Sequence, residues 1–224
     1  FLDRKTSVKD DVGHGTHVAG IIAANANDIG IAGLAPSNIK IMPVKILNSK
    51  TKDFVYDNKL ITDIFADGIS FARRHGAHII NLSLGWPKLV QTTKIKRELR
   101  LAQEAGILIV AAAGNNNKDI PVFPCTDNGV LCVGALDNKG KITEFTNYGG
   151  KIDLLAPGES IISTYPMNKE SRTLRITGYE KKRGSSQAAP YVAGFAAVVK
   201  LMNPEISLNE LKARLFSSAR NVQD

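Results

Sequence analysis

The chain has 224 residues, of which 43% are hydrophobic, and carries a formal net charge of +8. This length and composition allow one sizeable core, so we expect a single domain over residues 1–224. No apolar run is long enough for a membrane span, no signal peptide stands at the start, and the scattered basic residues lack the aromatic interleaving of a nucleic-acid footprint.

Helical and strand patterns alternate along the chain. Periodic or small apolar residues predict helices near residues 14–24, 58–75, 92–105, 186–202 and from residue 207, where Ser207 and Glu210 form a capping box. Continuous apolar runs predict strands near residues 39–47, 78–84, 107–112, 130–135, 151–156, 160–165 and 173–177. This alternation predicts an α/β fold: a three-layer, doubly wound, mostly parallel sheet with helices on both faces.

A serine stands at the start of the fourth predicted helix. Ser186 lies among small residues (GSSQAAPYVAG, residues 184–194), and we expect Pro190 in the first turn of the helix. The backbone N–H groups at a helix N-terminus have no intrahelical partner, so negative charge is stabilised there. Alone, this pattern also fits a capping serine on a buried helix.

Two other segments supply what a nucleophilic serine needs, a base and a donor for the oxyanion. His14 stands between two glycines at a helix start, where an imidazole can project into a cleft. Asn115 follows the apolar strand at its carboxyl end, where open α/β sheets keep their sites. His17 lies on the buried side of its helix, and packing accounts for it.

Together these segments resemble the subtilisin-like serine proteases over essentially the whole chain. The similarity lies in four motifs in the family's order: DVGHGTHVAG (residues 11–20), NLSLG (81–85), AAAGN (111–115) and residues 184–194. The resemblance implies a serine endopeptidase with His14 as general base, Ser186 as nucleophile and Asn115 in the oxyanion hole. It also implies a peptide-binding wall at Ser83, Leu84, Gly85, Ala112 and Gly114, and no catalytic cofactor.

The chain departs from the family at several positions near the nucleophile. Ser185, Gln187 and Tyr191 stand where the family usually has Thr, Met and His, so the substrate preference is open. Trp86 follows Gly85 where the family has a small residue, and it can close part of the cleft or stack on a substrate side chain. Val122, aligned with the floor of the first specificity pocket, would make that pocket shallow.

The triad aspartate of the family has no counterpart in the chain. Asp10 and Asp11 precede His14 too closely to reach behind its ring, and they resemble acidic residues that flank the family's substrate cleft. The first residue is Phe1 rather than Met, as in a processed or partial product. We expect the domain to be N-terminally incomplete, with a separate segment or second chain supplying an Asp on an apolar strand.

The loop NANDIGI (residues 25–31) resembles a loop that wraps calcium in many subtilisins. Its ligands would be the carbonyls of Asn25, Ile29 and Ile31 and the side-chain oxygen of Asn27. These oxygens fall short of the roughly six to eight that calcium prefers, so a structural Ca²⁺ and an empty loop both stay open.

Cys125 and Cys132 fit no zinc pattern, and both a small disulfide loop and two free thiols stay open. The resemblance favours an extracytoplasmic location and leaves the cytoplasm open. Two alternatives to an endopeptidase remain: a catalytically silent binding or regulatory module, and a peptide ligase or macrocyclase that uses the same acyl-enzyme.

Overall fold

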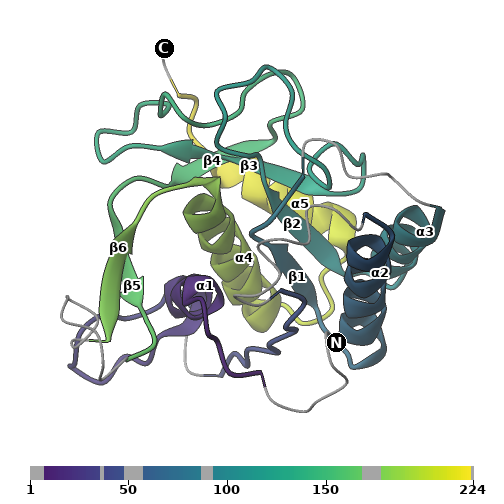
Figure 1. Cartoon of the computed structure of the whole chain (residues 1–224), viewed down its shortest axis with the longest axis horizontal. Coiled ribbons are helices and arrows are strands. Elements are labelled where there is room, and N and C mark those ends of the chain that lie inside the picture. Colours follow the sequence, from purple (N-terminus) through teal and green to yellow (C-terminus); the bar gives the residue numbers. More distant parts are fainter. Residues whose placement is uncertain (1–7, 36–37, 48–57, 87–92, 168–177, 223–224) are drawn as a thin grey trace.

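The structure is a computed structural model that describes residues 8–35, 38–47, 58–86, 93–167 and 178–222. Its elements in chain order are α1 (His14–Ala23), α2 (Asn58–Arg74), β1 (Ile79–Leu82), α3 (Thr93–Glu104), β2 (Leu108–Ala112), β3 (Leu131–Leu136), β4 (Leu154–Pro157), β5 (Ile161–Thr164), β6 (Tyr179–Lys182), α4 (Ser185–Met202) and α5 (Leu208–Ser218). Figure 1 shows α4 running beside the sheet, with α2 and α3 together at one side of the molecule.

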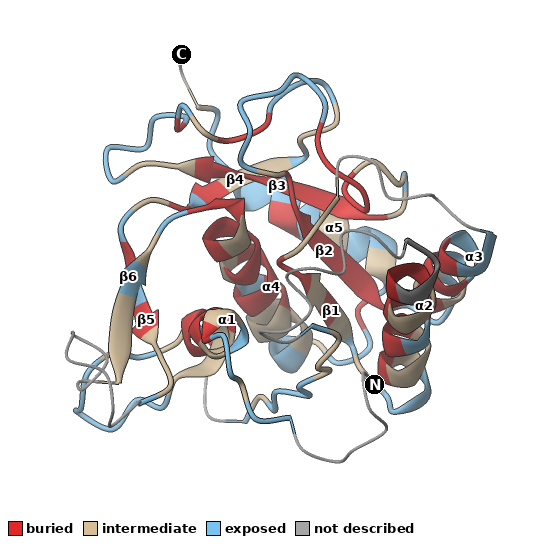
Figure 2. Ribbon diagram, viewed as in Figure 1, coloured by how far each residue is buried: buried red, intermediate tan, exposed pale blue. Residues whose placement is uncertain are grey.

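Strands β1 to β4 form a parallel sheet in the order β1-β2-β3-β4. Every residue of β2 is buried, because side chains that point to opposite faces both meet helices. Ile109 and Ala111 belong to a core cluster with α2 and α3, whereas Leu108, Val110 and Ala112 belong to a cluster with α4 and α5. The buried residues of β2, β3 and α4 occupy the middle of the molecule (Figure 2). The α/β fold with helices on both faces of a parallel sheet is confirmed.

The strand predicted over residues 39–47 is wrong. Residues 38–47 belong to no strand, although Val44 and Ile46 pack against Gly68 of α2. Strand β1 lies at the end of the sheet order, so no described strand pairs with its outer edge. The apolar pattern of this segment reflects its packing on α2, because a strand also needs a neighbour for its backbone groups.

A separate antiparallel ladder joins β5 to β6, with Ile161 opposite Lys182. The pattern over residues 160–165 predicted β5, but β6 was not expected, and the strand predicted at residues 173–177 lies outside the described residues. His17 of α1 packs under this ladder, fully buried, with Nε2 within 3.2 Å of the Ile161 carbonyl and 3.0 Å of the Glu180 carbonyl. The contact holds α1 against β5 and β6.

The ends of the helices follow local chemistry. The Ser207 side chain accepts a hydrogen bond from the Glu210 N–H (3.2 Å), as the capping box predicts. Pro190 lies inside α4 rather than in its first turn, because the helix begins at Ser185. Within the described residues, no helix combines the length and apolar character needed to cross a bilayer.

Candidate active site

Ser186 is the second residue of α4, so its N–H lies in the first turn, where a helix offers no internal acceptor. Gly184, which precedes the helix, has a φ of 147°, a backbone conformation that favours glycine. A β-carbon at Gly184 would lie 3.1 Å from the Asn115 Nδ2. The glycine therefore lets the start of α4 approach Asn115 closely.

Pro190 explains an unusual contact of the Ser186 backbone. Since proline has no N–H, the carbonyl of Ser186, four residues earlier, lacks its helical donor. The Ser83 hydroxyl donates to that carbonyl at 2.7 Å, and Asn81 Nδ2 donates to the Ser83 hydroxyl at 2.9 Å. In return, the Ser186 hydroxyl donates to the Ser83 carbonyl at 3.1 Å. The segment that follows β1 thus holds the first turn of α4.

Ser185 orients the side chain of Asn115. The Asn115 Oδ1 accepts hydrogen bonds from the Ser185 N–H (2.7 Å) and hydroxyl (2.9 Å), while the Gly114 N–H donates to the same hydroxyl (3.0 Å). With Oδ1 occupied, the Nδ2 group is the end of the amide left for another molecule. This role of Ser185 was missed in the sequence, where only its departure from the family pattern was visible.

A cavity of about 380 Å³ adjoins these residues. Its lining contains Leu84, Gly85, Ala112 and Gly114 of the predicted wall, together with Asn115 and Ser186. Ser83 is buried beneath the wall and holds α4 rather than lining the cavity. The complete lining is Leu47, Leu84, Gly85, Trp86, Ala112, Gly114, Asn115, Asn116, Val122, Ser185 and Ser186, and none of these side chains is charged.

Val122 closes one end of this cavity. A β-carbon at Gly85 would overlap one methyl group of Val122, and a β-carbon at Gly114 would lie 2.9 Å from the other. The side chain therefore sits between the two walls and narrows the space there. Trp86 also lines the cavity, and its ring packs edge-on against Phe65 of α2 at 5.7 Å between centroids.

His14 is the first residue of α1, but it does not line the cavity. Burial lowers the pKa of the imidazole, and the charge of Lys182 lowers it further, while Asp10 acts in the opposite direction. In the described part of the chain, no hydrogen bond joins His14 to the Ser186 hydroxyl or to a carboxylate. The structure thus gives the predicted base a half-buried position, and among the described residues no hydrogen-bonded carboxylate orients its ring.

Asp10 caps the start of α1. Its carboxylate accepts from the Val12 N–H (3.0 Å), the Gly13 N–H (2.7 Å), and the N–H and hydroxyl of Thr16 (both 2.7 Å). Burial would raise the pKa of Asp10, but these hydrogen bonds, those from Thr16 first, bring it below its usual value. Asp11 instead pairs with Lys45 at 2.7 Å. In the described part of the chain, neither Asp10 nor Asp11 hydrogen-bonds to His14.

The loop predicted to hold calcium lies beside a second cavity, of about 360 Å³. Asn25, Asn27, Ile29 and Ile31 all line it, so the four residues predicted to bind calcium border a common space. The Asn27 side-chain oxygen accepts a weak hydrogen bond from the Ile29 N–H at 3.4 Å. Among the described residues, no cluster of His, Cys, Asp or Glu accompanies them. The donor set is oxygen-only and uncharged, which fits a hard cation in kind but not in number.

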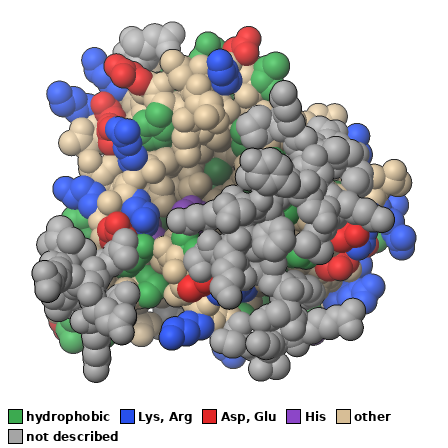
Figure 3. Space-filling view, in the orientation of Figure 1, with side chains coloured by type: hydrophobic (Ala, Val, Ile, Leu, Met, Phe, Trp, Pro, Cys, Tyr) green, Lys and Arg blue, Asp and Glu red, His purple; other side chains and the backbone are tan. Residues whose placement is uncertain are grey.

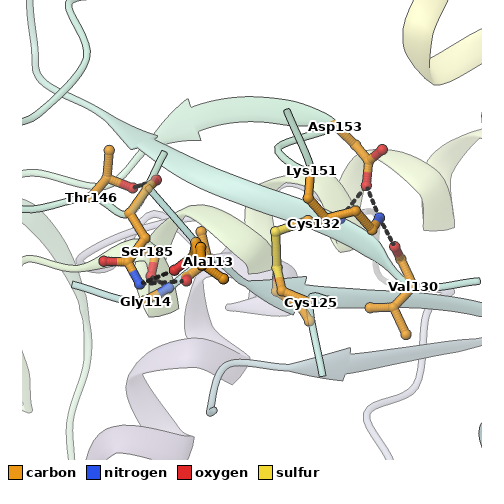
Figure 4. Close-up of a disulfide and its surroundings, with 12 residues drawn as sticks. Ala113, Gly114, Cys125, Val130, Cys132, Thr146, Lys151, Asp153 and Ser185 are labelled. Atoms are coloured by element: carbon orange, nitrogen blue, oxygen red, sulfur yellow. Dashed lines mark hydrogen bonds and ion pairs between the residues drawn. A yellow bond between two sulfur atoms is a disulfide. The ribbon is translucent and has the colours of Figure 1, made fainter. Parts of the chain in front are cut away.

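Cys125 and Cys132 form a disulfide, one of the two alternatives that the sequence left open. Both residues are fully buried, and Cys132 is paired with Ala111 in the sheet. Figure 4 shows the bond beside the segment of Ala113 and Gly114 that approaches Ser185. The bond joins the chain just after Val122 to β3, so it braces the closed end of the first cavity.

In this α/β fold, a serine at a helix N-terminus lies beside an oriented amide and an uncharged cavity. This arrangement is suited to acyl transfer. A model of the subtilase family matches residues 2–224. The chain belongs to this family, and its class is that of the serine peptidases.

Individual relatives agree with this assignment. The chain is 34% identical to subtilisin DY of Bacillus licheniformis, over all of this chain and 76% of that protein. A crystal structure of a cold adapted subtilisin-like serine proteinase superposes with a TM-score of 0.79 and 27% identity, covering 97% of this chain and 72% of the other. The prenylagaramide maturation protease PagA superposes with a TM-score of 0.75 and 30% identity, covering 96% and 75%.

Proposed function

We propose that the protein is a serine endopeptidase in which Ser186 is the nucleophile, His14 the general base and Asn115 an oxyanion donor. The observation that carries this proposal is the pair of hydrogen bonds from Ser185 to the Asn115 Oδ1, because it leaves the Nδ2 group beside the nucleophile. Helix α4 adds the Ser186 N–H as a second donor.

The chemistry follows from these positions. The Ser186 hydroxyl leaves the Ser83 carbonyl and gives its proton to His14, and Oγ bonds to the substrate carbonyl carbon. The Asn115 Nδ2 and the Ser186 N–H hold the resulting oxyanion. His14 then passes the proton to the leaving amine, and the peptide bond breaks. A water, deprotonated by the same imidazole, attacks the ester carbon. The bond to Oγ then breaks, His14 returns the proton to Oγ, and the second product leaves as a carboxylic acid.

The uncharged cavity would take the side chain on the acyl side of the cleaved bond. Leu84, Trp86 and Val122 supply apolar surface, and a charged side chain there would lose its water without gaining a partner. Because Val122 fills the narrow end, apolar side chains of moderate size fit better than the largest aromatic ones.

His14 needs a carboxylate from outside the described residues. The free edge of β1 and the segment 38–47 offer a place for an added strand between them, since Leu47 and Leu84 line the same cavity but no ladder joins their segments. The segment 38–47 also exposes apolar side chains, among them Ile41, Met42 and Leu47. We therefore assign to this edge a separate apolar strand that carries an Asp toward His14.

Two further features belong to the proposal. A structural Ca²⁺ at the loop 25–31 would be held by the carbonyls of Asn25, Ile29 and Ile31 and by Asn27, and would order that loop. The buried disulfide favours an extracytoplasmic location, because oxidising compartments keep such bonds.

The test is covalent labelling with a fluorophosphonate probe, in the presence of a peptide that supplies the Asp-bearing strand, followed by peptide mapping. The expected result is one labelled residue, Ser186, and no labelling of the Ser186→Ala variant. The variant should fold normally, since a hydroxyl at a helix start contributes only about 1 kcal/mol. A folded protein that is never labelled would instead support a silent binding module. A labelled protein that joins peptides rather than hydrolysing them would support a ligase.

A further inference from the structure

We propose that Lys182 binds an acidic side chain on the leaving-group side of the cleaved bond, so that the enzyme prefers Asp or Glu just after that bond. This inference rests on the proposed function of Ser186 and His14. Lys182 is the last residue of β6, four positions before the nucleophile. Figure 3 shows histidine atoms near the middle of one face of the molecule, with Lys or Arg side chains next to them.

A chain of contacts links Lys182 to the residue that precedes His14. The Lys182 Nζ lies 4.9 Å from the centre of the Tyr165 ring. The Tyr165 hydroxyl donates to the Val12 carbonyl at 2.8 Å, and its ring packs so closely on Gly13 that a β-carbon there would overlap it. Gly13 directly precedes His14. The Tyr165 ring therefore contacts both the Lys182 ammonium group and Gly13 at the start of α1.

The leaving group must pass on the side of Ser186 that faces His14. The imidazole gives its proton to the departing amine, so the amine and the residues after it lie next to His14. The acyl half lies on the other side, where its side chain enters the uncharged cavity. None of Gly13, Tyr165 or Lys182 lines that cavity. Lys182 therefore faces the half of the substrate that leaves first.

The charge near His14 is positive on balance. Glu180 lies 3.4 Å from the Lys182 Nζ, but its carboxylate acts on His17, whereas Lys182 is the strongest charge acting on His14. Asp10, the nearby carboxylate, is occupied by the cap of α1. An ammonium group has three donors, so Lys182 can remain paired with Glu180 and donate to a second carboxylate. The next basic residue, Arg183, lies over Phe145 instead, 5.7 Å from its ring.

Matched peptides test this inference. Two peptides that differ only by Asp or Asn at the first position after the cleaved bond are compared by kcat/KM. The wild-type enzyme should prefer the Asp peptide, and Lys182→Gln should lower that preference about fivefold, the range of a partly exposed ion pair. Lys182→Glu should reverse the preference toward a peptide with Lys at the same position. The preference should also weaken at high salt.

Lys181→Gln is the control. It removes the same charge from the same strand, but its side chain points to the opposite face of β6 from that of Lys182. It should leave the Asp-to-Asn ratio at the wild-type value. Equal ratios for wild type and Lys182→Gln, or an equal loss in Lys181→Gln, would overturn the inference and leave the proposed function standing. Failure to cleave either peptide, together with no labelling of Ser186, would overturn both.

Discussion

Ser83 and Ser186 hydrogen-bond each other in both directions: each hydroxyl donates to the other residue's carbonyl, at 2.7 Å and 3.1 Å. The first bond exists because Pro190 leaves the Ser186 carbonyl without a helical donor. The second gives the Ser186 hydroxyl proton an acceptor on the segment that follows β1. This segment and helix α4 are therefore joined at Ser186 itself.

The first prediction concerns this pair. Ser83→Ala removes the donor to the Ser186 carbonyl and the acceptor of the Asn81 amide, so the free energy of unfolding should fall by about 1–3 kcal/mol. Loss of the contact should also lower kcat more than it changes KM, because the first turn of α4 loses its anchor. Denaturant unfolding and steady-state kinetics measure the two effects. Ser83→Thr keeps a hydroxyl and should recover both; an alanine variant equal to wild type would show the pair to be dispensable.

The second prediction concerns the oxyanion donor. Asn115→Leu should lower kcat by roughly 10²–10³-fold with little change in KM, the loss known from the corresponding change in a subtilisin. Ser185→Ala removes one of the two donors that hold the Asn115 Oδ1, so its loss of kcat should be smaller, since the Ser185 N–H remains. Kinetics on one peptide ester compares the two variants. An effect of Asn115→Leu on KM alone would reduce Asn115 to a substrate contact.

A feature could be predicted from the sequence where neighbouring residues alone determine it. Ser186, His14 and Asn115 stand in long contiguous motifs beside a predicted helix or strand, so their positions at helix starts and a strand end could be predicted. Whether residues 39–47 form a strand could not be predicted, because a strand needs a pairing neighbour from a distant part of the chain. Residues 38–47 carry a strand-like apolar pattern but lack that neighbour.

The finer chemistry of the site depends on contacts that spacing does not encode. Asp10 reaches forward to the Thr16 N–H and caps helix α1, a contact that the sequence did not predict. The Ser185 hydroxyl meets Asn115 across 70 positions of sequence. The α-carbons of Cys125 and Cys132 lie 4.8 Å apart, close enough for a disulfide, and only the fold decides that approach.

The third prediction concerns Asp10. Asp10→Ala removes the acceptor of four hydrogen bonds at the start of α1, and it should lower the free energy of unfolding by about 1 kcal/mol at neutral pH. The pKa of Asp10 is lowered in the folded state, so its contribution is complete above the unfolded value of about 3.9 and disappears as pH falls through the folded value. The difference between the variant and wild type should thus vanish in strong acid. Asp11→Asn, which removes one partner of a surface ion pair with Lys45, should change stability by less at neutral pH.

The fourth prediction concerns calcium. If the loop 25–31 holds Ca²⁺, added CaCl₂ should raise the Tm and EDTA should lower it, because a ligand bound only by the folded state stabilises it. Asn27→Ala removes the one side-chain ligand and should reduce this shift. Isothermal titration with CaCl₂ measures the binding directly. A Tm that responds to neither addition would leave the loop as a structural turn alone.

The last prediction concerns the carboxylate that His14 lacks among the described residues. An imidazole without it is neither held in the productive tautomer nor stabilised when it becomes charged, a loss of about 3 × 10⁴ in kcat for the corresponding change in subtilisin. A peptide with an Asp on an apolar strand, added to the protein, should pair with the free edge of β1 and restore fast labelling of Ser186. Burial and the charge of Lys182 lower the pKa of His14, and an added carboxylate should raise it again because its negative charge favours the protonated ring. The acid limb of the labelling rate should therefore move to higher pH. The same peptide with Asn in place of Asp should pair but not restore labelling. If the Asn peptide works equally well, the strand acts by completing the fold. If residues 1–224 alone label at full speed, no added carboxylate is required.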